Sequence, residues 1–154
     1  MPIATYHLAQ INIARVRAPL DDPLMADFVA QLDAVNAIAD ESPGFVWRLK
    51  AEDGGASTYV RAFDDDRIII NMSVWESVEA LQQYVYRDQH GGVFRDRRKW
   101  FEPLADPSLA LWWVLAGHIP TIAEGKERLE TLARLGPTLE AFTFKSYFPP
   151  AEMD

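Results

Sequence analysis

Residues 67–75 read RIIINMSVW, and they constrain the fold more tightly than any other part of the chain. Their β-branched and apolar side chains predict a strand over 67–74. Successive side chains of a strand point to opposite faces of its sheet. Ile68, Ile70 and Met72 take one face, and Ile69, Asn71, Ser73 and Trp75 take the other. Because both faces carry apolar side chains, the sheet needs cover on both sides.

Seven further elements are predicted around this strand from apolar spacing, caps and chain breakers. The other strands cover 3–16, 45–50, 109–117 and 140–148. Helices are expected to begin at Asp22, Ser77 and Thr121, where a capping residue precedes an apolar period. The order is then β-α-β-β-α-β, followed by an additional α-β.

The first of these helices shows the helical apolar period most clearly. Five of its apolar residues recur at three- and four-residue intervals and are expected to face the sheet: Leu24, Phe28, Leu32, Val35 and Ile38. The helix should end before Gly44, where Ser42, Pro43 and Gly44 form a break.

The first six elements match the ferredoxin-like arrangement, so the predicted fold class is α+β. Two helices cover one face of such a sheet and leave the other bare. Because strands 67–74 and 109–117 are apolar on both faces, we expect a second copy of the chain to cover the bare face. The predicted assembly is a homodimer, a dimeric α/β barrel in which residues 1–154 form one domain. The C-terminal α-β either extends the same sheet or reaches across to the partner.

Composition excludes several classes of function. The chain has no Cys, which removes disulfides, thiolate catalysis and Cys-based zinc sites, and which fits a cytoplasmic protein. Its net charge of −8 repels phosphate backbones, so no nucleic-acid partner is expected. The longest apolar runs fall far short of the roughly 20 residues that cross a membrane, so no membrane association is expected.

Residues 86–101, YRDQHGGVFRDRRKWF, gather basic residues among aromatic ones. If 90–101 is helical, His90, Arg97 and Trp100 share one apolar stripe. A buried Arg needs an anion, so Arg97 could bind an acidic oxygen of a substrate while His90 acts as general acid/base. The alternative is structural, with Arg97 paired to a local carboxylate and His90 capping a helix end.

Other candidate ligand-binding residues are amides, Trp residues and one His. Asn12 and Asn71 lie on strands where apolar residues are expected, and they would either orient a polar ligand or satisfy each other. Trp47, Trp112 and Trp113 could wall a cavity or simply fill the core. His118 lies at a strand end, where it could contact a ligand or order a loop. No His spacing is typical of a metal site, so no metal is expected.

Four stretches together resemble a known family: INMSVWESVEALQQYVY (70–86), HGGVFRDRRKWFEP (90–103), LWWVLAGHIPTIAEGKERLETLARLGP (111–137) and AFTFKSYFP (141–149). They are similar to the bacterial domain-of-unknown-function family 3291, and the resemblance covers nearly the whole chain. It implies the dimeric α/β-barrel superfamily. A looser similarity to the antibiotic-biosynthesis monooxygenases rests on Trp75-Glu76-Ser77.

Haem-degrading relatives in the same superfamily use an Asn on the first strand, with a Trp and a His on the second helix. Asn12 and His90 could stand in for two of these residues, but the helix has no Trp before His90. No cofactor is therefore expected.

Two functions remain open at this point, beside a purely structural dimer whose filled barrel would have no cavity. One is a cofactor-independent monooxygenase-like or isomerase-like enzyme that acts on a small hydrophobic molecule bearing an acidic oxygen. Such chemistry needs a dry cavity, a base and an oxyanion stabiliser, for which His90, Arg97 and Asn12 are the candidate catalytic residues. The other is a dimer that binds or senses a small hydrophobic ligand without catalysis.

Overall fold

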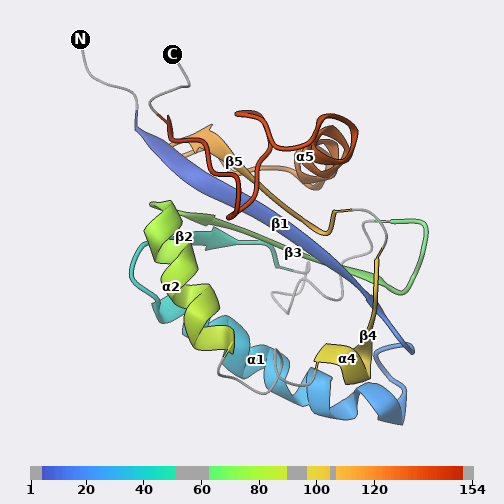
Figure 1. Cartoon of the computed structure of the whole chain (residues 1–154). Helices are drawn as coiled ribbons and strands as arrows, with labels where there is room; N and C mark the ends of the chain where they lie inside the picture. The colour runs from blue at the N-terminus through green and yellow to red at the C-terminus, as the bar shows by residue number, and fades with distance from the viewer. Residues whose placement is uncertain (1–4, 51–62, 90–96, 105–106, 151–154) are drawn as a thin grey trace.

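The computed structural model of the chain describes residues 5–50, 63–89, 97–104 and 107–150 (Figure 1). Its strands are β1 (Tyr6–Val16), β2 (Phe45–Arg48), β3 (Ile68–Trp75), β4 (Phe101–Glu102) and β5 (Leu109–Leu115). Its helices are the 3-10 turn η1 (Pro23–Met25), α1 (Ala26–Glu41), α2 (Val78–Gln89), the one-turn α4 (Arg97–Trp100) and α5 (Ile122–Leu135). The first six predicted elements are present in the predicted order, with α4 and β4 inserted before β5.

The sheet is antiparallel and is centred on β1. Strand β3 pairs with one edge of β1, and β2 lies outside β3. The other edge of β1 pairs with β5 along most of its length and with β4 at its end. The order β2-β3-β1-β5 is the ferredoxin-like order, so the predicted α+β fold is confirmed.

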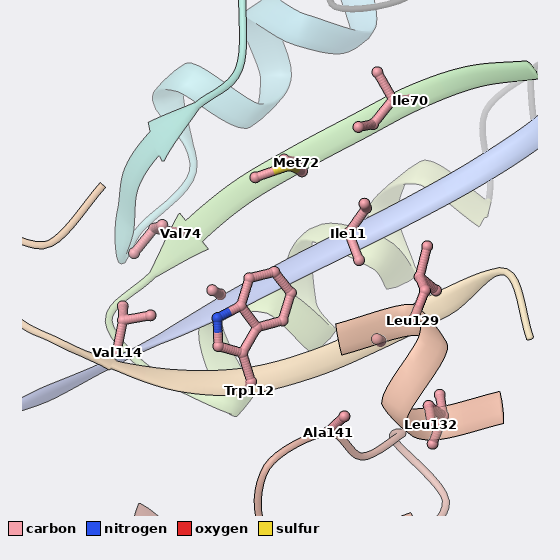
Figure 2. Close-up of a cluster of buried hydrophobic side chains, with 11 residues drawn as sticks. Ile11, Ile70, Met72, Val74, Trp112, Val114, Leu129, Leu132 and Ala141 are labelled. Carbon is pink, nitrogen blue, oxygen red and sulfur yellow. The ribbon is translucent and has the colours of Figure 1, made fainter. Parts of the chain in front are cut away.

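The helices divide between the two faces of the sheet (Figure 1). The inner face is covered by α1 and α2, whose side chains pack with Leu8 and Trp75 of the sheet and with Trp100 beyond it. The outer face is covered by α5, whose Leu129 and Leu132 lie in a cluster with side chains of β1, β3 and β5 (Figure 2).

Ser77 and Thr121 cap α2 and α5 as the sequence predicts, whereas Asp22 caps the 3-10 turn η1 and α1 begins at Ala26 without a side-chain cap. The side chain of Asp22 accepts a hydrogen bond from Leu24 N at 2.9 Å, that of Ser77 from Ala80 N at 3.1 Å, and that of Thr121 from Glu124 N at 3.1 Å. Each bond satisfies one of the backbone N–H groups that a helix start leaves without a partner. Helix α5 ends at Gly136, which has a positive φ of 73°.

The apolar stripe of α1 differs in part from the prediction. Phe28 is buried, but Leu24 and Ile38 are 51% and 45% exposed. Leu24 belongs to the 3-10 turn before the helix, and Ala39 replaces Ile38 on the inner side. Eleven residues make three helical turns, so Ala39 and not Ile38 faces the same way as Phe28.

The last predicted strand, 140–148, is wrong as a continuous element. It meets the sheet at a single bridge, with two hydrogen bonds of 2.9 Å between the backbones of Leu111 and Phe142, while Ala141 bridges back to Thr138. The chain then turns, and Thr143 Oγ1 accepts a hydrogen bond from Ser146 N. Aromatic packing explains the turn, because Phe142, Tyr147 and Phe148 gather on the same side near Trp113. The C-terminal segment thus extends the sheet of its own chain, at one residue pair.

Helix α5 covers the outer face of the sheet. It can approach closely because Gly125 has no side chain: a Cβ there would stand 2.9 Å from Ile11 Cδ1 and 3.0 Å from Met72 Sδ. Both sheet residues are fully buried. The argument that a second copy must cover this face is therefore wrong, because the chain covers it with its own helix. The homodimer itself stays a prediction.

Candidate functional site

A cavity of about 310 Å³ lies between the inner face of the sheet and helices α1 and α2. Its floor is formed by β1 and β3, chiefly through Gln10, Asn12 and Asn71. Its walls are mostly apolar and come from several elements: Phe28, Leu32 and Val35 of α1, Leu81, Tyr84 and Val85 of α2, and Phe101, Leu109 and Phe144. A small, mostly apolar molecule fits such a space.

The floor of the cavity is a network of amide groups. In the register of β1 and β3, Gln10 lies opposite Ser73 and Asn12 opposite Asn71, so four polar side chains form a square. Gln10 Nε2 donates hydrogen bonds to Asn71 Oδ1 and Ser73 Oγ, both at 2.7 Å. Asn12 Nδ2 donates to Gln10 Oε1 at 3.0 Å and to Asn71 Oδ1 at 3.3 Å. Trp75 Nε1 donates to Ser73 Oγ at 2.8 Å and anchors the network to the core.

This network passes from the buried interior to the mouth of the cavity. Gln10 is only 3% exposed, Asn71 is half-buried and Asn12 is exposed. A buried amide is costly unless its hydrogen bonds are made, and Gln10 makes three here. The buried end therefore holds the asparagines in place, while the open end meets solvent or a ligand.

The wall from α2 is tied to the floor by stacked rings. The ring of Tyr84 lies 5.1 Å from that of Trp75 at an interplanar angle of 25°. Trp75 also meets Phe45 edge-on, with ring centroids 5.4 Å apart. Since Trp75 is fully buried and bonds to Ser73, the position of α2 depends on the same residues as the amide floor.

The structure brings together two of the predicted site residues, Asn12 and Asn71. They both make hydrogen bonds within the floor and line the cavity, so the two alternatives foreseen for them coexist. Sequence reasoning missed Gln10, although a signal was available. Gln10 and Asn12, like Asn71 and Ser73, are two residues apart on one strand, and this spacing places polar groups on one face.

The four predicted Trp residues lie outside this cavity. Trp47 and Trp112 belong to the core on the outer face of the sheet. Trp113 is on the inner face, but it packs against Phe142 and donates through Nε1 to the backbone oxygen of Phe148 at 2.8 Å. Trp100 packs against Phe28, with ring centroids 5.5 Å apart. Trp100, Trp112 and Trp113 are buried, so geometry supports core packing for them, whereas Trp47 is half-buried.

The helix predicted over 90–101 corresponds in the described residues to the single turn α4, Arg97–Trp100. Residues 90–96 lie outside the described part of the chain, so the structure does not place His90. Phe101 already belongs to β4. Arg97 is exposed, and the expectation that it points inward is wrong. Helix α4 has a single turn, and Trp100 is its buried residue.

His118 lies on the side of the sheet opposite the cavity. Its Nε2 is 2.8 Å from Glu124 Oε1, and Trp112 Nε1 donates to Glu124 Oε2 at 2.9 Å. Burial alone raises the pKa of Glu124, but the hydrogen bonds from His118 and Trp112 outweigh it, and the pKa lies below its ordinary value. The pair joins the loop after β5 to the first turn of α5, which is a structural role.

Among the described residues, no group of three or more His, Asp or Glu side chains is arranged to hold a metal ion. Within the same residues, none of the helices combines the length and apolarity that a membrane crossing requires.

The fold and the cavity define the protein as a ferredoxin-like α+β domain with a polar-floored pocket of small-molecule size. The chain belongs to the family described as Domain of unknown function (DUF3291), whose model matches residues 7–154. No curated protein shows significant sequence similarity to it.

Several solved structures are similar to this chain at low sequence identity. The crystal structure of NE2512, a protein of unknown function from Nitrosomonas europaea, is 12% identical with a TM-score of 0.51, and the match covers 77% of this chain and 99% of that one. A mutant of SnoaB, a cofactor-independent oxygenase from Streptomyces nogalater, is 17% identical with a TM-score of 0.46, covering 73% and 95%. PA3566 from Pseudomonas aeruginosa is 12% identical with a TM-score of 0.44, covering 76% and 100%.

Proposed function

We propose that this protein is a cofactor-independent oxygenase-like or isomerase-like enzyme that acts on a small, mostly apolar molecule carrying one acidic oxygen. The observation that supports the proposal is the cavity between the sheet and helices α1 and α2, with amides on its floor and apolar walls. The walls would hold the body of the molecule, and the floor would meet its oxygen. The general acid/base role of His90 remains part of the proposal.

The amide floor suits a reaction in which negative charge develops on that oxygen. Removal of a proton beside a carbonyl group gives an enolate, and fixed N–H donors lower the energy of the charge as it forms. Asn71 has an N–H₂ group that makes no hydrogen bond with any described residue, and it lies on a strand of a rigid sheet. Fixed donors act at no cost of reorganisation during the reaction.

Anthrone, a tricyclic ketone with an acidic methylene group, is a suitable probe reaction. After a proton leaves the methylene carbon, the enolate reacts with dioxygen. The methylene carbon is oxidised by four electrons to a second ketone, one oxygen atom entering it and the other leaving as water. The net change is anthrone plus O₂ giving anthraquinone plus H₂O, and it can be followed by oxygen uptake and by absorbance.

The test compares the wild type with Asn71→Leu, which keeps the branched shape and removes the amide. We expect the wild type to accelerate the oxidation above buffer and the variant to lose roughly 100-fold of that acceleration, as expected for a lost oxyanion donor. Gln82→Leu is the matched control, because Gln82 is an exposed amide on α2 outside the cavity lining. Thermal unfolding of each variant checks that the fold survives. An unaccelerated reaction, or one that Asn71→Leu leaves unchanged, contradicts the oxyanion role.

A second candidate function is binding without catalysis, as in a carrier or a sensor. It is favoured by the lining itself, because Tyr84 is the only ionisable side chain among the described residues that line the cavity. A binder needs no acid or base. If the wild type binds the probe without accelerating its oxidation, this second function replaces the first.

A further inference from the structure

We infer that the ligand of this cavity is uncharged and carries a hydrogen-bond donor next to a hydrogen-bond acceptor, as in a cis-lactam or an enolised 1,3-dicarbonyl group. This inference rests on the proposed function, because it names the class of molecule that the same cavity would take. It is carried by the charge of the lining and by the hydrogen-bond capacity that the amide floor leaves over.

The described lining carries no formal charge. It contains no Asp, Glu, Lys, Arg or His among residues 5–50, 63–89, 97–104 and 107–150. An ionised ligand would lose its hydration on binding and would find no opposite charge to compensate it. A protein with net charge −8 also repels anions in general. A neutral ligand avoids both the uncompensated loss of hydration and the repulsion by the protein's net charge.

The remaining hydrogen-bond capacity follows from the contacts of the floor. Gln10 uses both N–H groups and its oxygen, and Ser73 Oγ accepts from Gln10 and Trp75. Asn12 uses both N–H groups, and Asn71 Oδ1 accepts two hydrogen bonds. Among the described residues, no partner remains for Asn12 Oδ1, an acceptor, or for Asn71 Nδ2, a donor.

These two unpaired atoms belong to directly opposed residues. Asn12 and Asn71 face each other across β1 and β3, and their side chains are joined by the 3.3 Å hydrogen bond. Opposed residues of an antiparallel pair have Cβ atoms roughly 5 Å apart. A ligand group that bridges them must offer an acceptor to Asn71 and a donor to Asn12, on neighbouring atoms.

The hydrogen bonds of Asn12 and Asn71 continue through Gln10 to Ser73 and Trp75. Trp75 Nε1 can only donate, so Ser73 Oγ accepts from it, and the second acceptor site of Ser73 is taken by Gln10. Gln10 is buried, and turning its amide over would place its oxygen where an N–H group now donates to Asn71. In this arrangement Asn71 presents the donor and Asn12 presents the acceptor.

The test measures binding of four bicyclic probes of similar size, by calorimetry or by their own fluorescence. 2-Quinolinone offers a donor and an acceptor side by side, 1-methyl-2-quinolinone only the acceptor, naphthalene neither, and 2-naphthoate a charge. We expect 2-quinolinone to bind most tightly, about tenfold better than its methylated form, and 2-naphthoate to bind no better than naphthalene.

Two variants then match each protein atom to one ligand atom. Asn12→Leu should remove the preference for 2-quinolinone over 1-methyl-2-quinolinone, because only the former has the N–H group that Asn12 accepts. Asn71→Leu should weaken both quinolinones by a similar factor, because both carry the carbonyl group. Gln82→Leu should change none of the four affinities, and circular dichroism confirms that each variant is folded.

The outcomes separate this inference from the function on which it rests. Equal binding of all four probes, or tightest binding of 2-naphthoate, overturns the inference while the cavity keeps its role as a binding site. Equal loss of both quinolinones in Asn12→Leu also overturns it. If the wild type binds none of the four probes, the proposed function fails and the inference fails with it.

Discussion

At the scale of single residues, Glu124 shows how one side chain connects separate parts of the chain. It accepts hydrogen bonds from Trp112 on β5, and it lies beside His118 in the loop that follows. Its backbone N–H donates to the capping side chain of Thr121. One carboxylate therefore joins the sheet, the loop and the first turn of α5, where a negative charge also suits the helix dipole.

This arrangement predicts a pH-dependent contribution of Glu124 to stability. A carboxyl group whose pKa is lowered by folding stabilises the protein above its ordinary pKa, and the contribution is lost as pH falls through the lowered value. The stability advantage of the wild type over Glu124→Gln should therefore be full above the ordinary pKa of a glutamate and shrink as the pH falls below it. Urea unfolding of both proteins at several pH values measures this difference in the free energy of unfolding. Glu127→Gln, at an exposed position of α5, is the control, and a difference that does not change with pH would contradict the prediction.

At the scale of elements, Gly44 sets the distance between the start of β2 and helix α2. Its φ of 83° is rarely adopted by other residues, and a Cβ there would stand 2.5 Å from Ala80 Cβ on α2. Its backbone oxygen accepts a hydrogen bond from Glu76 N at 2.8 Å. Leu81, Tyr84 and Val85 of the same helix line the cavity, so this contact also supports the site.

Gly44→Ala should be strongly destabilising for two additive reasons. The left-handed backbone costs a side chain roughly 1–2 kcal/mol, and overpacking against the rigid helix costs about 1–3 kcal/mol more. Gly117→Ala is the matched control, because Gly117 also has a positive φ but no atom within 4 Å of its Cβ position. Chemical denaturation of both variants isolates the cost of the clash. Equal losses would show that α2 moves aside freely.

At the scale of the whole molecule, the chain covers both faces of its own sheet. Helices α1 and α2 lie on one face and α5 on the other, so Ile11, Met72 and Trp112 are fully buried within one chain (Figures 1 and 2). A homodimer, if it forms, therefore does not need this face. The predicted dimer would have to use another surface or exchange α5 between copies.

Loosening α5 should expose the outer face and promote self-association. Leu129→Ala removes a buried side chain of the helix and should cost about 2–4 kcal/mol of stability. Light scattering should then show a larger fraction of higher-mass species than in the wild type, whose own mass tests the homodimer. Glu130→Ala, at an exposed position next to Leu129, is the control. An unchanged mass distribution after a loss of this size would mean that α5 does not protect the face.

The residues that were predicted well are those whose signal is local. Ser77 and Thr121 cap α2 and α5, and Asp22 caps the 3-10 turn before α1, because a side-chain oxygen reaches a backbone N–H only two or three residues away. Strand β5 was predicted from an apolar run that needs no knowledge of its neighbours. Asn12 and Asn71 were recognised as unusual because they interrupt apolar strands.

The misses concern residues whose environment depends on distant segments. Arg97 and Trp100 occupy one short helix, and the packing of Trp100 into the cluster around Phe28 decides which of them is buried. Residues 140–148 alternate between apolar and polar residues as a strand does. In the structure, three aromatic side chains gather near Trp113 and the chain turns away after Phe142. The partners of Gln10 lie more than 60 residues away, so its place in the amide floor depends on how β1 pairs with β3.

The order of elements, the helix caps and the two-sided apolar strands follow from the sequence alone, because they depend on propensity and periodicity over a few residues. The covering of the outer face by α5, and the union of Gln10, Asn12, Asn71 and Ser73 in one floor, were decided only by the tertiary structure. The physical reason is register. Hydrogen bonds between β1 and β3 set which residues lie opposite each other, and no local pattern contains that information.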